Sequence, residues 1–222
     1  MQMAMLEHST LEQGASLLQV IVAAAAVWVA HRGLQTWRHQ LYGTVEYDHA
    51  RRLYRAVLEL RETLAGVRAP YISGGEIASA FSEAGVEPTH DGLNIDPRSD
   101  GIVYNRRWGA VQKARVSLHA ELLEAEALWG AGVTETARPL FACIGELYAA
   151  VMWRIRESSP QSTRRHREPS ESEMRLSQRM NDVIYSTGSD DDEYAKRLTW
   201  AVAGMETMLT PHLRSRSPRA AS

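Results

Sequence analysis

Apolar residues recur at alternating three- and four-residue spacings in several long segments, which is typical of helices with one buried face. The first segment runs from Thr44 to Arg68, between Gly43 and Pro70. A proline disfavours helical geometry in the residue before it, so Pro70 predicts the end of this helix. Its apolar stripe consists of Leu53, Val57, Leu60, Leu64 and Val67.

Four further segments show the same periodicity and predict helices at about 103–129, 135–157 and 171–186, and from Ser189 to Pro211. The apolar stripe of the first of these consists of Trp108, Val111, Leu118, Leu122 and Ala125, and that of the second consists of Leu140, Ile144, Leu147, Val151 and Ile155. The third carries Leu176, Met180, Val183 and Ile184, and the fourth carries Leu198, Val202, Met205 and Leu209. The last helix should hold the acidic residues 190–193 in its first turn, where they stabilise the helix dipole. No segment alternates as a strand does.

Two stretches rich in glycine, proline and serine predict long connections, at residues 69–102 and 158–170. Within the first, only residues 76–83 favour a short helix. The basic residues 214–222 have the composition of a disordered tail. We therefore expect an antiparallel helical bundle over residues 35–213, with about five helices.

An uncharged apolar run precedes this bundle. A bilayer core of about 30 Å needs roughly 20 predominantly apolar residues. The uncharged run of residues 15–30 is shorter than that and reaches a spanning length only together with its flanking residues. We predict a transmembrane anchor at residues 15–34, after a short tail of residues 1–14, so the fold class is all-α with an N-terminal transmembrane helix. Residues 1–14, which precede the apolar run, contain no Lys or Arg, and this argues against a cleaved signal peptide. Burial of the Ala-rich helix inside a soluble bundle remains an alternative.

Basic residues follow the apolar run directly, and none precedes it. Arg32 and Arg38 lie just after it, and positively charged flanks stay in the cytoplasm. This predicts a single-pass protein of a bacterial inner membrane with its N-terminus outside and its bundle in the cytoplasm. A second basic cluster, Arg164, Arg165 and Arg167, is a candidate for contact with anionic headgroups, with a solvated loop as the alternative.

The composition excludes some classes of function. The net charge of -2 gives no bias toward nucleic acid, so we expect none as a partner. The single Cys143 excludes an internal disulfide and a cysteine metal cage, and its apolar neighbours predict a small core residue. Nucleotide-loop and hydrolase motifs are lacking in the sequence.

One pattern suggests a metal. Glu46 and His49 have the Glu-x-x-His spacing found in di-iron carboxylate bundles, and His119, Glu121 and Glu124 offer side chains on another helix but not that spacing. A second Glu-x-x-His is lacking, and surface residues at a helix start are the favoured explanation of the pattern. We therefore expect no bound cofactor.

Three short segments resemble a group of uncharacterised bacterial membrane proteins that have one N-terminal span and a cytoplasmic helical domain. The segments are residues 36–38, residues 50–53 with 60–61 and 67–70, and residues 123–130. The resemblance implies this architecture and no activity.

Together these patterns predict a membrane-tethered helical interaction or scaffold module rather than an enzyme. Its expected partners are the lipid bilayer and either a second copy of the chain or another protein. A metal-dependent enzyme built on a helical bundle and a wholly soluble bundle remain the alternatives.

Overall fold

The computed structural model describes residues 26–33, 44–87, 98–158 and 169–214, and every regular element in these ranges is a helix. The all-α prediction is confirmed. Residues 26–33 and 44–68 are helical. The other helices are α2 (Gly74–Ala84), α3 (Ser99–Trp129), α4 (Gly132–Ser158), α5 (Glu171–Ile184) and α6 (Glu193–Arg214).

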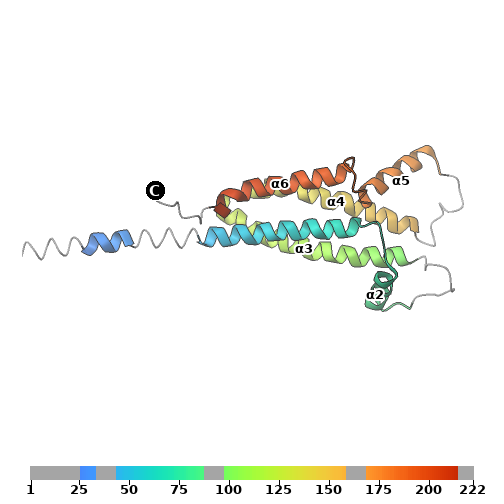
Figure 1. The fold of residues 1–222 in the computed structure, drawn as a ribbon, viewed down its shortest axis with the longest axis horizontal. Coiled ribbons are helices and arrows are strands. Elements are labelled where there is room, and N and C mark those ends of the chain that lie inside the picture. Colours follow the sequence, from blue (N-terminus) through green and yellow to red (C-terminus); the bar gives the residue numbers. More distant parts are fainter. Residues whose placement is uncertain (1–25, 34–43, 88–97, 159–168, 215–222) are drawn as a thin grey trace, which may run out of the picture. The chain divides into compact units, whose positions relative to one another are not determined.

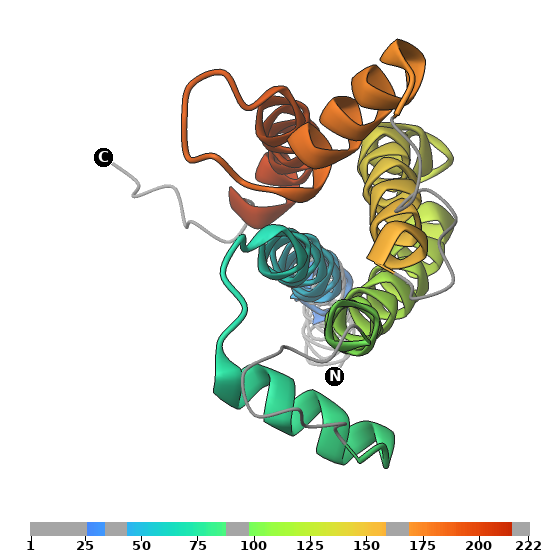
Figure 2. The same ribbon diagram turned by 90° about the vertical axis from the view of Figure 1, so that its right-hand side faces the viewer.

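The chain divides into two compact units, one of residues 1–47 with 216–222 and one of residues 48–215. The larger unit holds the bundle, in which helix 44–68, α3, α4 and α6 run alongside one another (Figures 1 and 2). α4 packs against both α3 and α6, while the shorter α2 and α5 pack against α3 and α4, respectively.

Ion pairs at successive levels show that neighbouring long helices are antiparallel. Asp100 near the start of α3 pairs with Arg154 near the end of α4. Arg197 near the start of α6 pairs with Glu146 in the second half of α4. Arg52, early in helix 44–68, pairs with Glu121, late in α3. The order up, down, up, down is the simplest topology of a four-helix bundle.

The apolar stripes predicted from the sequence form the core. Every residue of the stripe in helix 44–68 is fully buried, and α6 buries its whole predicted stripe. One continuous cluster joins these residues to those of α3 and α4. Leu176 in α5 is the exception, because it is 38% exposed where burial was predicted. The C-terminal half of α5 reaches the core, with Val183 and Ile184 buried in it and Met180 packed against it.

Side-chain caps define the starts of the two shorter helices. The Ser73 hydroxyl accepts the backbone N–H of Glu76 at the start of α2. Ser170 and Glu173 form a reciprocal capping box at the start of α5. Gly85 ends α2 with φ of 64°, a left-handed conformation that glycine adopts without steric cost.

Several predicted boundaries were wrong. α3 begins at Ser99, four residues earlier than the predicted start at Val103, and so shortens the expected connection. α6 continues through Pro211 to Arg214, although a stop was predicted there. Leu213, which packs against the core, holds this last turn in place beyond the proline. Of the acidic run, only Glu193 belongs to α6.

The predicted anchor, residues 15–34, lies mostly outside the described residues. Its described part, residues 26–33, is helical and exposed throughout. Arg38, Arg164, Arg165 and Arg167 also lie outside the described residues, as do residues 1–14 and 215–222. Among the helices in the described ranges, none combines the length and the apolar character needed to cross a membrane.

Candidate functional site

A histidine and two carboxylates meet between helix 44–68 and α3. His49 Nδ1 lies 3.0 Å from a carboxylate oxygen of Glu124. Glu121, one turn earlier on α3, completes a group whose possible ligand atoms all lie within 4.8 Å of one another. The residue types and the spacing are those of a carboxylate–histidine metal site.

The guanidinium of Arg52 lies within this group. Its Nε donates to Glu121 at 3.2 Å, and one Nη donates to Glu124 at the same distance. That Nη also lies 2.7 Å from His49 Nδ1. Hydrogen bonding to Glu121 is the main cause that raises the pKa of Arg52. The arrangement supplies its own cation, so a metal ion would have to displace a paired guanidinium.

The other two candidate ligands do not join this group. His119 is exposed on α3 and is not among the clustered residues. Glu46 belongs to the smaller unit and is also outside the cluster. The sequence had singled out His49, Glu121 and Glu124 as possible ligands, but not Arg52. Glu121 and Glu124 are three residues apart and therefore lie on one face of the helix.

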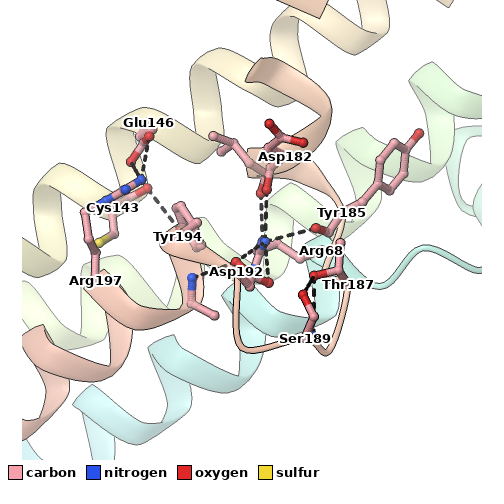
Figure 3. A network of polar contacts seen from close by, with 12 residues as sticks. Arg68, Cys143, Glu146, Asp182, Tyr185, Thr187, Ser189, Asp192, Tyr194 and Arg197 are labelled. Carbon is pink, nitrogen blue, oxygen red and sulfur yellow. Dashed lines mark hydrogen bonds and ion pairs between the residues drawn. The ribbon is translucent and has the colours of Figure 1, made fainter. Parts of the chain in front are cut away.

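A buried arginine, Arg68, forms the most extensive polar network in the described part of the chain (Figure 3). Its Nε donates to the carbonyl of Val183 at 2.7 Å. One Nη lies 3.0 Å from the carbonyl of Tyr185 and 2.9 and 3.0 Å from the carboxylate oxygens of Asp192. The carbonyl of Arg68 accepts the N–H of Ser186. The guanidinium and the backbone carbonyl of Arg68 therefore hold the α5–α6 connection against the end of helix 44–68.

Asp192 joins this network to the start of α6. Its carboxylate accepts the N–H of Ala195 at 2.9 Å and so caps the helix. Burial alone would raise its pKa, but the hydrogen bonds from Arg68 and Ala195 outweigh that effect and lower it. Asp192 was predicted to lie in the first turn of the helix, but it is buried just before the first residue of α6, Glu193.

The same network reaches α4 through an aromatic ring. The guanidinium of Arg68 lies 4.5 Å from the ring centroid of Tyr194, whose hydroxyl donates to the carbonyl of Cys143 at 3.1 Å. Burial raises the pKa of both Tyr194 and Cys143. A buried thiol with a raised pKa is a poor nucleophile, so the burial of Cys143 confirms its prediction as a core residue.

A second arginine, Arg107, holds the first connection at the same end of the bundle. It forms a two-pronged ion pair with Glu76, at 2.6 and 2.7 Å, which fixes α2 to α3. It also donates to the carbonyls of Ala69 and Tyr71. Hydrogen bonds from this guanidinium are the main cause that lowers the pKa of Glu76. Arg107 therefore holds the segment between helix 44–68 and α2 in place through hydrogen bonds to the backbone of that segment.

Two of the pockets among the described residues lie beside the shorter helices α5 and α2. One, of about 400 Å³, lies between the end of α4 and α5 and is lined by Glu157, Glu173 and Asn181, among others. It lacks a nucleophile with an adjacent base, and no histidine lines it. Another, of about 600 Å³, is an open groove between α2 and α3.

No protein-family model matches the chain, and no curated protein or solved structure matches it either.

The pair between Arg68 and Asp192 predicts a pH-dependent stability. Replacing Asp192 by Asn should cost about 3 kcal/mol of unfolding free energy at pH 7, because a buried guanidinium loses its counter-charge. The pKa of Asp192 is lower in the folded state, so its ionic stabilisation is complete above the unfolded value and is lost as pH falls through the folded one. The difference between the wild type and the variant should therefore shrink only below about pH 4.

Urea unfolding followed by circular dichroism between pH 7 and pH 3, in mild detergent, measures this difference. Asp191→Asn is the control, because Asp191 is exposed next to the network and its loss should change stability little. A difference that stays constant down to pH 3 would contradict the assignment.

Proposed function

We propose that the protein is a membrane-tethered helical interaction module, which presents its bundle at the inner face of a bacterial membrane. The proposal combines an apolar segment that needs an apolar partner with a bundle that offers no catalytic arrangement in its described part.

The exposed helix 26–33 is the observation that carries the tether. Val27, Trp28 and Val29 are each at least 60% exposed, which is costly for such residues in water. The guanidinium of Arg32 lies 5.1 Å from the ring centroid of Trp28. An indole beside a basic residue suits the headgroup level of a bilayer, where an apolar ring and a charge are both accommodated.

The polar groups of the bundle support an interaction role rather than catalysis. Arg68, Arg107 and Arg52 all bind carboxylates of the same chain, and each pair joins two elements. Apolar side chains meanwhile face outward from the long helices. The large exposed ones in the bundle are Tyr71, Val116, Leu123, Leu128, Tyr148, Met174, Leu176 and Trp200. Such side chains, when they gather on one face, mark surfaces that bind other proteins.

Topology labelling tests the tether. A membrane-impermeant thiol reagent on intact cells should reach Ser9→Cys but not Ser217→Cys, each in a Cys143→Ala background. The basic residues lie only on the C-terminal side of the apolar run, and that imbalance sets orientation. Labelling of Ser217→Cys alone would place the bundle outside. Labelling of neither, with the protein in the soluble fraction, would favour the soluble bundle.

The metal-dependent enzyme is the second candidate, and the grouping of His49, Glu121 and Glu124 favours it. Elemental analysis of the purified protein separates the two proposals. We expect well under one metal ion per chain, because Arg52 already neutralises the carboxylates. Near-stoichiometric iron, manganese or zinc that is lost in Glu121→Gln would favour the enzyme.

A further inference from the structure

The outward face of α3 carries an unpartnered apolar stripe. Val116, Ala120, Leu123 and Ala127 recur at four–three–four spacing and are all exposed. Val116 is 68% exposed and Leu123 is 58% exposed. At 100° per residue, these positions lie opposite the buried stripe that includes Leu118 and Leu122. The spacing is that of a coiled-coil seam, in which small and branched residues alternate against a second helix.

A helix of the same chain, α2, already covers the N-terminal part of this face of α3. α2 packs against the first half of α3, and the groove between them is lined by Ala80, Ala84, Gly109, Ala110 and Lys113, with others. Gly109 lies one heptad before Val116, so the stripe begins at the groove and continues beyond α2 (Figure 2 shows α2 outside the bundle). The exposed stripe is thus the uncovered continuation of a helix-binding surface.

The charges beside the stripe change sign along α3. Lys113 and Arg115 lie at its beginning and are exposed. Lys113 interacts electrostatically with Glu83 of α2, whereas Arg115 forms no ion pair within the described ranges. Glu126 lies at the other end of the stripe, where Glu124 is already paired with Arg52. A helix face that is basic at one end and acidic at the other complements a copy of itself only in the antiparallel orientation.

From the stripe, the groove and the charges, we infer that the partner of this face is a second copy of the chain. The two α3 helices pack antiparallel about a twofold axis near Ala120. Lys113 and Ala127 are equally far from Ala120, so each lies opposite the other across the axis. Arg115 then lies close to the partner's Glu126, on the same side of the interface. The contact is isologous, so it closes as a dimer.

The groove gives this register a specific contact. Leu128 is 46% exposed and flanks the stripe just after Ala127. In the antiparallel pair it lies opposite Ala110 and Lys113, where the groove between α2 and α3 opens. The walls of this groove include the apolar residues Ala80, Ala84 and Ala110, so an apolar leucine side chain can pack into it. Two such contacts, one from each copy, add to the stripe.

The expected stability of the dimer rests on the proposed tether, whereas the geometry of the dimer does not. A stripe with two large apolar residues buries little area, so the dimer should be weak in dilute solution. Confinement to one membrane raises the effective concentration of the partners.

Cysteine cross-linking in the full-length chain tests the register, in a Cys143→Ala background. Two differently tagged variants, Lys113→Cys and Ala127→Cys, are co-expressed, and membranes are treated with a mild oxidant. We expect a disulfide between the two variants and about tenfold less product from either variant alone. A mixture of Lys113→Cys with Ala203→Cys, which places the second thiol on the outward face of α6, is the control and should give none.

Homodimers of Lys113→Cys alone would overturn the antiparallel arrangement, and no product from any combination would overturn the self-association through α3. A fractionation experiment on the same samples separates this inference from the proposed function. Membrane-bound protein without the α3 disulfide refutes the dimer and leaves the tether standing. The α3 disulfide in soluble protein supports the dimer and refutes the tether.

A charge placed in the stripe supplies an independent measurement. Leu123→Glu should weaken self-association about tenfold in sedimentation of the detergent-solubilised chain, while circular dichroism stays unchanged because the side chain is exposed. Trp200→Glu is the matched control, since Trp200 is 69% exposed but lies on α6. Equal effects of the two substitutions would show that α3 is not the interface.

Discussion

The guanidinium of Arg68 is the interaction on which the C-terminal half of the bundle depends. A buried charge is tolerated only when it is paired and its hydrogen bonds are satisfied. Arg68 meets both conditions through Asp192 and three backbone carbonyls. All of these acceptors belong to the end of α5 and the connection that follows. Without Arg68, these carbonyls would lose a hydrogen-bond donor and the carboxylate of Asp192 would be buried without a counter-charge. The start of α6 is therefore fixed by a residue of helix 44–68.

Arginine performs a similar task on the other side of the bundle. Arg107 fastens the segment after helix 44–68 and holds α2 against α3, just as Arg68 fastens the segment before α6. Arg154 joins the end of α4 to Asp100 at the same end. The planar guanidinium of arginine suits this role because it donates several hydrogen bonds in fixed directions. These contacts leave the outward faces, and above all the stripe of α3, as the surface open to a partner.

The sequence predicted the long helices and their buried faces, because a helical period is a local property that does not need the tertiary structure. It did not predict the Arg68 network, whose partners lie more than a hundred residues away. One signal was present: Arg68 follows Leu64 by four residues and so continues the apolar stripe, where a charge needs a buried partner. The end of α6 was missed because contacts of Leu213 with the core outweigh the local effect of Pro211.

The most direct test of the role of Arg68 is hydrogen–deuterium exchange of the full-length wild type and of Arg68→Lys. Lysine keeps the positive charge but cannot reach the carbonyls and the carboxylate together. Peptides that cover Ser186 and Ala195 should lose protection in the variant, while those covering Leu118 on α3 keep theirs. Unchanged protection at Ser186 and Ala195 would contradict the account, and so would an equal loss throughout the bundle.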